Sequence, residues 1–225
     1  MNRDELRTRA PGLPPSLHTI GARSILMPID PVSQGTWIGI NDCGIFVSLL
    51  NLTEPDQPSN PDKSSLSRGG IIPLILKHST LDRAIDEARH ILTANYSPFR
   101  LLIGAREGLY VLHSRARTLK SLAPPLLLTS SGLGDDLVQT PRAMLFVSTI
   151  ARDPSASTQD AFHYHVFPGQ HHLSVFMDRA DARTVSTTTL EISSVSATMY
   201  YQDILTGEMS SSALTLAHPA ETAIP

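Results

Sequence analysis

The sequence has little of several features that would define its class at once. It contains a single cysteine, Cys43, so an internal disulfide is excluded, and this scarcity suits a reducing compartment. No apolar run approaches the ~20 residues that a membrane-spanning helix needs. No charged segment followed by an apolar one opens the chain, as a leader would. We therefore expect a soluble, cytoplasmic protein without a membrane span.

A strong charge of either sign is also lacking. With 18 Lys and Arg against 21 Asp and Glu, the formal net charge is only −3, so we expect no nucleic-acid partner. At 225 residues and 41% hydrophobic, the chain is long enough for one well-buried domain. We expect that domain over residues 1–205. A flexible tail is expected over 206–225, where the composition turns small and polar.

Familiar catalytic signatures are absent as well. There is no glycine loop for phosphates and no Gly-x-Ser-x-Gly elbow. Cys43 has no neighbouring histidine in sequence, and we interpret it as structural. His163 and His165 would share a strand face and, with His171 and His172, form a candidate site for a metal-dependent enzyme. No carboxylate or cysteine lies at a telling spacing from them, so we expect neither a metal nor another cofactor.

Turn residues and apolar periodicity predict hairpins, then helices, then more hairpins. Several prolines lie in residues 6–34, so we expect no long regular element there. The expected elements are a hairpin over 35–51 with its turn at 41–44, a loop over 52–69, helices over 71–77 and 79–92, a hairpin over 100–113, a strand over 124–129, a helix from 141 to about 151 with Thr140 as its N-cap, and strands over 172–177, 184–192 and 195–201. This order predicts an α+β fold in which helices cover antiparallel sheets.

The polar stretch at the start of the chain is the strongest candidate site. An Asp beside an Arg, as in Arg3-Asp4, can hold a nucleophile or its amine in one protonation state. Asn51, at the end of an expected strand, can donate a hydrogen bond to a developing oxyanion. Asn2, Arg3, Asp4 and Asn51 are therefore candidate catalytic residues. The structural alternative is an Arg3–Asp4 ion pair that holds the N-terminus in place.

Two further side chains are candidates for ligand contact. Arg68 could bind a carboxylate or phosphate through both arms of its guanidinium, or it could lie at the surface. Trp37, the only tryptophan, could stack on a ligand or anchor the core.

Several motifs together resemble the NRDE family, also called the transport and Golgi organisation protein 2 family, which takes its name from the residues found here as Asn2-Arg3-Asp4-Glu5. The resemblance covers roughly residues 2–203 in the family's order. The other similar motifs are Gly35-Thr36-Trp37-Ile38-Gly39, Asn41-Asp42-Cys43-Gly44, Ser48-Leu49-Leu50-Asn51, Ser67-Arg68-Gly69, Leu127-Leu128-Thr129-Ser130-Ser131, Thr140-Pro141-Arg142 and Met177-Asp178-Arg179-Ala180-Asp181-Ala182-Arg183-Thr184-Val185-Ser186.

The resemblance implies an αββα sandwich of the N-terminal-nucleophile hydrolase type, similar to choloylglycine hydrolases and penicillin acylases. Two mainly antiparallel sheets would be flanked by helices. In the cysteine-type enzymes an N-terminal cysteine attacks an amide, and its own α-amine is the base. Asp4 would then bind that amine and Asn51 would donate to the oxyanion. Ser130 or Ser131, which replaces a family asparagine, would contact the ligand.

The main departure from the family lies at the start of the chain. Family members begin with Met-Cys and a leading strand, whereas this sequence begins at the motif. We expect that the first strand and its cysteine precede an internal methionine, because losing the strand would expose backbone groups of its neighbours. The resemblance then implies a hydrolase of non-peptide C–N amide bonds whose cysteine is absent from this chain. The alternative is a non-catalytic binding or trafficking protein for a lipid, an acyl thioester or haem.

Overall fold

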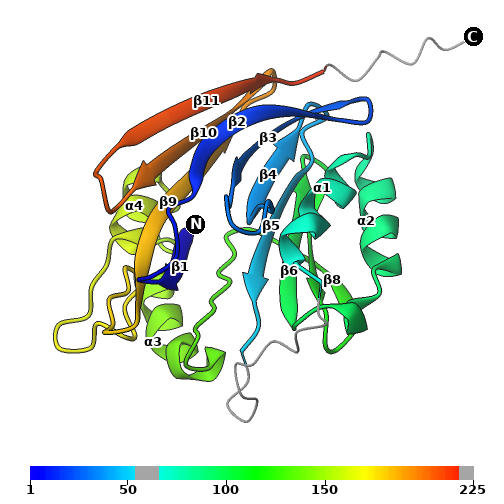
Figure 1. The fold of residues 1–225 in the computed structure, drawn as a ribbon. Helices are drawn as coiled ribbons and strands as arrows, with labels where there is room; N and C mark the ends of the chain where they lie inside the picture. Colours follow the sequence, from blue (N-terminus) through cyan, green and yellow to red (C-terminus); the bar gives the residue numbers. More distant parts are fainter. Residues whose placement is uncertain (54–65, 218–225) are drawn as a thin grey trace, which may run out of the picture.

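The structure is a computed structural model that describes residues 1–53 and 66–217. Two antiparallel sheets pack face to face, with one pair of helices on each outer side (Figure 1). This confirms the predicted α+β fold with two sheets between helices. No helix in the described part of the chain is both long and apolar enough to cross a membrane.

Eleven strands build the two sheets in the described ranges. Their bounds are β1 Asn2–Leu6, β2 Leu13–Ile20, β3 Arg23–Ile29, β4 Ile38–Asn41, β5 Phe46–Asn51, β6 Phe99–Ala105, β7 Gly108–His113, β8 Thr118–Leu122, β9 Ala182–Ile192, β10 Ser196–Asp203 and β11 Met209–Thr215. One sheet has the order β1-β9-β10-β11 and the other the order β2-β3-β4-β5-β6-β7-β8. Most of the seven-stranded sheet is thus a meander of sequential hairpins.

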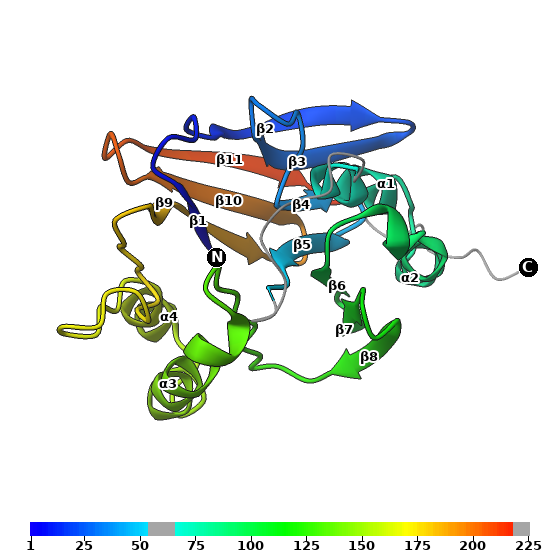
Figure 2. The ribbon, with the colours of Figure 1, turned by 60° about the horizontal axis from the view of Figure 1, so that its bottom comes forward.

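The helices fall into two pairs on opposite sides of the sheets (Figure 2). Their bounds are α1 Ile71–Leu76, α2 Leu81–His90, α3 Asp135–Ser148 and α4 Ala156–His163, with short 3-10 turns at Arg68–Gly70 and Thr93–Asn95. The predicted helix after Ser79-Thr80 is confirmed. Thr80 is its N-cap, because its side chain accepts a hydrogen bond from the N–H of Arg83 at 3.4 Å.

Two apolar clusters hold the layers together. The first packs α1 and α2 on the seven-stranded sheet, where Ile72, Ile75 and Leu76 contact side chains such as Val47 and Leu101. The second lies between the sheets, and its members include Leu26, Trp37, Ile40, Met199 and Tyr201. Burial of each such side chain contributes about 1.5–3 kcal/mol, so the first cluster holds the helices on their sheet and the second holds the two sheets together.

The strand β1 covers only part of its neighbour β9. Asn2 pairs with Thr187 and Leu6 with Ala182. The backbone of Met1 continues the pairing, because its terminal amine donates to the Thr188 carbonyl at 2.7 Å and its carbonyl accepts from the N–H of Thr188 at 2.9 Å. Beyond Thr188, β9 pairs only with β10 among the residues that the structure describes.

The expectation of irregular structure over residues 6–34 is wrong, because β2 and β3 occupy much of it. The prolines are tolerated because β2 is an edge strand, where a missing N–H disturbs no inner ladder. Its pairing shifts register between Leu13 and Ser16, on either side of Pro14 and Pro15. A proline-rich segment therefore forms the sheet edge.

The predicted helix start at Thr140-Pro141 is also wrong. The helix α3 begins one turn and a half earlier, at Asp135, so Pro141 lies inside it. Asp135 and Asp136 occupy its first turn, where the helix dipole favours negative charge. An acidic start therefore marks this helix better than its proline does.

Three predictions for the second half of the chain are corrected too. Residues 124–129 and 172–177 form no strand. Pro124-Pro125 removes two successive ladder donors, and the edge position is taken by β8. Residues 172–177 instead make short turns, as in the hydrogen bond from the N–H of Ser174 to the carbonyl of His171. Nor is the stretch from residue 206 wholly a tail, because β11 is an edge strand of the four-stranded sheet. Residues 218–225 lie outside the described ranges.

Candidate functional site

A cavity of about 690 Å³ brings most of the predicted site residues together. Its wall includes all four candidate catalytic residues, Asn2, Arg3, Asp4 and Asn51, and three of the candidate binding residues, Trp37, Arg68 and Ser130. These residues come from β1, the residue before β4, the end of β5 and the segments before α1 and α3. Positions up to about 130 residues apart in the sequence thus meet at one polar cleft.

Asp4 is a titratable side chain in this wall. Its Oδ1 accepts a hydrogen bond from Thr184 Oγ1 at 2.7 Å, and Oδ2 has no partner among the described residues. The side chain is accessible, yet it stands among protein atoms that desolvate it. This desolvation raises the pKa of Asp4, although the Thr184 hydrogen bond and the charge of Arg142 act in the opposite direction. A cavity carboxyl with a raised pKa is a candidate for proton transfer.

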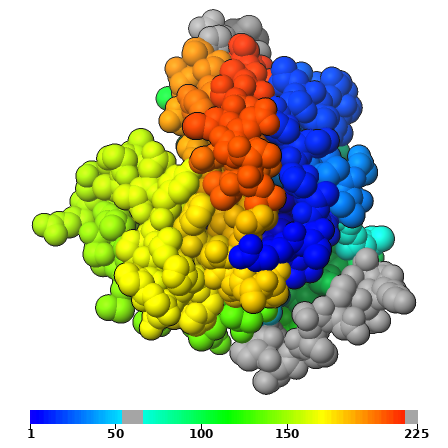
Figure 3. Space-filling model, turned by 60° about the vertical axis from the view of Figure 1, so that its left-hand side comes forward, coloured from blue at the N-terminus to red at the C-terminus, as the bar shows by residue number. Residues whose placement is uncertain are grey.

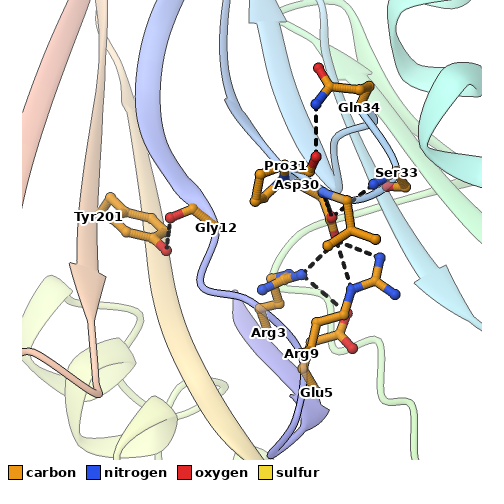
Figure 4. A network of polar contacts seen from close by, with 10 residues as sticks. Arg3, Glu5, Arg9, Gly12, Asp30, Pro31, Ser33, Gln34 and Tyr201 are labelled. Carbon is orange, nitrogen blue, oxygen red and sulfur yellow. Dashed lines mark hydrogen bonds and ion pairs between the residues drawn. The ribbon is translucent and has the colours of Figure 1, made fainter.

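Arg3 does not pair with Asp4, as the structural alternative required, but with Asp30. Its Nη2 lies 2.8 Å from Asp30 Oδ2 and 3.2 Å from Glu5 Oε1. Arg9 approaches the same oxygen of Asp30 at 2.8 Å, so one carboxylate binds two arginines (Figure 4). A bulge between Arg3 and Asp4 interrupts the β1–β9 pairing. Bulges re-aim side chains, and these two consecutive residues both line the cavity.

Asp30 also closes a turn after β3. Its Oδ1 accepts hydrogen bonds from the N–H groups of Val32 at 2.9 Å and Ser33 at 3.1 Å. Burial alone would raise the pKa of Asp30, but the hydrogen bond from Arg9 and those from the two N–H groups outweigh it, and the pKa is lowered. Asp30 is therefore held as a carboxylate.

The sequence allows Trp37 either to stack on a ligand or to anchor the core, and the structure places it in the core. Its side chain is 8% exposed and belongs to the cluster between the sheets. The guanidinium carbon of Arg3 lies 4.5 Å from the ring centroid, a cation–π arrangement. The ring is also part of the cavity wall, so the core and the site share this residue.

Arg68 is an arginine of the wall without a carboxylate partner among the described residues. Its Nη1 donates to the carbonyl of Pro98 at 3.1 Å. Desolvation lowers the pKa of Arg68, with the charge of Glu5 opposing it. The guanidinium therefore keeps N–H groups that can donate hydrogen bonds to an anionic or carbonyl group of a ligand.

A contact between two glycines holds the segment that carries Arg68. The N–H of Thr36 donates to the carbonyl of Gly69 at 3.2 Å. A Cβ placed on Gly69 would lie 2.7 Å from the Cα of Gly35, closer than packed atoms come. Only two glycines allow these backbones to touch, which explains the glycine in each motif.

Asn51 ends β5 with its side chain exposed. Its carbonyl accepts a hydrogen bond from Ser130 Oγ at 2.8 Å, so the segment before α3 is fastened beside it. Ser131 is not in the cavity wall. Its N–H instead donates to Asp135 Oδ1 at 2.9 Å, where it helps to start α3. Of the two serines predicted to contact ligand, the structure therefore places Ser130 at the site.

Asn2 uses its side chain to bind other parts of the protein. Its Nδ2 donates to the carbonyls of His163 and Val175, both at 2.8 Å, and its Oδ1 lies 2.7 Å from His163 Nδ1. The amide thus fastens β1 to the end of α4 and to the segment before β9. The expected strand face shared by His163 and His165 does not exist, because His163 is the last residue of α4. Among residues 1–53 and 66–217 no three ligating side chains gather as a metal site would require.

Arg142, a buried residue of α3 that was not predicted as a site residue, also borders the cavity. Its guanidinium donates to three backbone carbonyls, those of Ser130 at 3.2 Å, Leu173 at 3.0 Å and Ser174 at 2.6 Å. Desolvation lowers the pKa of Arg142, and the charges of Asp4 and Asp135 oppose this. The available signal was an arginine within the motif Thr140-Pro141-Arg142, in a helix with few other charges.

A second cavity, of about 800 Å³, lies between α4 and the four-stranded sheet. Its wall carries three tyrosines, Tyr164, Tyr200 and Tyr201, and two carboxylates, Asp160 and Glu191, without an arginine or lysine. Met1 and His163 belong to the walls of both cavities. Figure 3 shows the face on which the segment from α4 to β9 (yellow) lies against β10 and β11 (orange to red). The two cavities are therefore neighbours that meet at His163.

These features define an α+β protein with a polar cleft between two sheets. Residues 1–163 match the family described as Transport and Golgi organisation 2, and this is most of the chain. The chain belongs to that family, as its motifs predict. No curated protein matches the sequence significantly.

Solved structures with a similar outline include two variants of the conjugated bile acid hydrolase from Clostridium perfringens. One is 12% identical to this chain, covers 96% of it and 90% of its own length, and gives a TM-score of 0.47. The other is 12% identical, covers 97% and 92%, and gives a TM-score of 0.48.

Proposed function

We propose that the first cavity binds a small molecule with an amide or acyl group, and that the protein hydrolyses a non-peptide C–N bond when a cysteine is supplied next to β1. The observation that carries the proposal is that Asp4 and Asn51, which precede and follow the first hairpins in sequence, line one cavity. A carboxyl with a free Oδ2 and an exposed amide at one site suit a nucleophile's amine and an oxyanion.

The nucleophile is not among the residues of this sequence. Cys43, the only cysteine, lies outside the cavity wall and contacts Arg23 in the turn between β4 and β5. The proposal places the catalytic cysteine on residues that precede Met1. Such residues have a place to pair, because every second residue of β9 turns its backbone N–H and C=O groups toward the β1 side. After Thr188, those of Leu190 and Ile192 have no partner strand on that side in the described structure.

The test begins with the codons upstream of Met1. If they encode an in-frame Met-Cys and a strand, the extended chain is expected to react with an amide-mimicking electrophile at that cysteine. Replacement of that cysteine by alanine must abolish labelling, whereas Cys43→Ala must not. A stop codon directly before Met1, or an extended chain that is not labelled, would overturn the hydrolase proposal.

A second candidate function is a non-catalytic carrier of a lipid, an acyl thioester or haem in the same cavity. What favours it is the absence of any cysteine from the cavity wall of the chain as it stands, together with the volume of about 690 Å³, which suits a drug-sized ligand. The partly buried Arg68, without a carboxylate partner among the described residues, would then bind the polar end of the cargo.

Native mass spectrometry of the purified 225-residue chain tests the carrier function. Bound small molecules are expected in the wild type and in the control Arg89→Ala, whose arginine lies on the exposed face of α2. The variant Arg68→Ala is expected to lose most of them. Wild-type protein that is empty after purification from a lipid-rich extract would exclude this function.

A further inference from the structure

His163 lies where the two cavities meet and takes part in neither of the roles proposed above. It ends α4, and its ring contacts Phe162 edge-on, with centroids 5.5 Å apart. It belongs to the walls of both cavities. A ligand at the junction of the two cavities would therefore lie beside this residue.

The hydrogen bonds of Asn2 determine which ring nitrogen of His163 carries the proton. Two carbonyl oxygens, of His163 and Val175, each lie 2.8 Å from one end of the Asn2 amide. Carbonyls only accept, so this end must be the NH2 group, and the opposite end must be the oxygen. That oxygen lies 2.7 Å from His163 Nδ1, and because it can only accept, Nδ1 must donate.

It follows that Nε2 of the neutral ring has a free lone pair. No residue in the described ranges forms a hydrogen bond with this nitrogen. Since Nδ1 is already protonated, gaining a second proton would create an imidazolium inside the protein. Burial opposes that charge, and the positive charge of the Met1 amine adds to the effect, so the pKa of His163 is lowered to about 3.

The charged groups around the ring do not provide a counter-ion. Charged groups of the two walls include the Met1 amine before β1, Asp4 from β1, Arg142 from α3, Asp160 from α4 and Glu191 from β9. No carboxylate among them lies within ion-pair distance of the ring in the described structure, whereas His78 on the other side of the protein has Glu87 at 2.9 Å. His163 is thus a neutral acceptor rather than a cation.

We propose that Nε2 of His163 is a ligand-binding acceptor, so that the junction of the two cavities selects molecules with an N–H or O–H donor. This inference rests on the proposed function and names the chemical group that the site recognises. A secondary amide is preferred over an ester of the same shape, because the ester has no N–H hydrogen to donate. A ligand bound there extends from the cavity with Asp4 and Arg68 toward the cavity with the tyrosines.

Diethyl pyrocarbonate tests this assignment in the 225-residue chain. The reagent acylates an accessible unprotonated imidazole nitrogen, and peptide mass spectrometry locates the product. An ordinary exposed imidazole with a pKa near 6.5 loses ~tenfold in neutral fraction between pH 7.5 and pH 5.5. We expect the rate at His163 to change less than twofold over this range, after correction for reagent hydrolysis. A roughly tenfold fall at His163, or no reaction at either pH, would overturn the proposal.

The second arm uses N-butylacetamide and butyl acetate, which have the same shape and differ in the N–H. The amide is expected to slow acylation of His163 at a concentration where the ester does not. Equal protection by both probes, or by neither, would overturn the donor preference. The exposed His172 is the internal reference for reagent activity. Acylation needs no catalytic cysteine, so its outcome is independent of whether the hydrolase proposal holds.

Discussion

Arg3 and Asp30 join the two sheets across the cavity. Arg3 stands on β1 of the four-stranded sheet, and Asp30 directly follows β3 of the seven-stranded sheet, with 2.8 Å between Nη2 and Oδ2. Both side chains are buried, at 6% and 8% exposed. The pair therefore fixes one end of the inter-sheet space, where the apolar cluster around Trp37 fixes the rest.

Asp30→Ala should strongly destabilise the protein. The variant leaves the buried Arg3 with only Glu5 at 3.2 Å and removes the carboxylate partner of Arg9. Loss of one partner of a buried ion pair costs about 3–5 kcal/mol. The N–H groups of Val32 and Ser33 also lose their acceptor. Urea unfolding followed by circular dichroism measures the change in the free energy of unfolding.

The control for this variant is Asp86→Ala on α2. Asp86 and Arg89 form an ion pair at 3.1 Å in which both side chains are 58% exposed. Such pairs contribute about 0–1 kcal/mol. Equal losses in the two variants would contradict the special role of Asp30.

Asp4→Asn should stabilise the protein at neutral pH and flatten its pH dependence. The pKa of Asp4 is raised in the folded state by desolvation, so the folded state binds this proton more tightly than the unfolded state does. Wild-type stability then gains from Asp4 as the pH falls through the folded pKa, and loses it as the pH rises. Unfolding free energies of both proteins, measured from acidic to neutral pH, give the difference that isolates Asp4.

Comparing the two proteins at each pH removes the contribution of Asp30, which has the opposite sign because its pKa is lowered. The amide introduced by Asp4→Asn retains an oxygen that can accept from Thr184. A variant that is less stable than wild type at pH 7 would show that the carboxylate is a favoured structural partner rather than a desolvated site group.

Gly69→Ala should disturb the segment that carries Arg68. The new Cβ would lie 2.7 Å from Gly35 Cα and 3.0 Å from the nitrogen of Thr36. Backbone atoms must shift to relieve this, at a cost of about 1–3 kcal/mol. Thermal unfolding measures the loss, and native mass spectrometry shows whether ligand occupancy falls with it.

The neighbouring Gly70→Ala is the matched control. A Cβ at Gly70 meets nothing within 4 Å, and its φ of −77° suits any residue. The expected change is a gain of about 0.4–1 kcal/mol from lower entropy of the unfolded chain. If Gly69→Ala were as well tolerated as this control, the close backbone contact would be refuted.

Asn2→Ala should cost about 1–3 kcal/mol, because the carbonyls of His163 and Val175 lose their donor inside the protein. Asn95→Ala, at an exposed position in a 3-10 turn, should change the unfolding free energy by less than about 0.5 kcal/mol. Chemical unfolding at pH 7 compares them. A neutral Asn2→Ala would mean that β1 is held to α4 by other contacts.

Local sequence signals predicted the hairpins well. Asn41-Asp42-Cys43-Gly44 forms the expected turn, and Gly44 has the positive φ of 79° that such a turn requires. The strands β9 and β10 follow from their Val, Thr and Tyr content. What failed were segments where long-range pairing overrides local preference. The pair Pro14-Pro15 predicts a break in regular structure, yet the segment that contains it forms β2 because it pairs with β3.

The site was predictable in part for a similar reason. Asn2, Asp4 and Asn51 lie in motifs, so resemblance to the family groups them from the sequence alone. Asp30 lies in no quoted motif, Arg142 was quoted in a motif without a role at the site, and His163 was considered only as a metal ligand. Their roles depend on partners distant in sequence, such as Arg9, 21 positions from Asp30, Leu173, 31 positions from Arg142, and Asn2, 161 positions from His163. Sequence spacing carries no information on contacts of that kind.

The three hydrogen bonds of Arg142 have a mechanical consequence. One guanidinium holds the carbonyl of Ser130, before α3, together with those of Leu173 and Ser174, after α4. The two stretches are therefore fastened to each other through this one side chain. Moving either stretch away from the other requires breaking hydrogen bonds of this one side chain, so Arg142 couples the two segments that border the cavity.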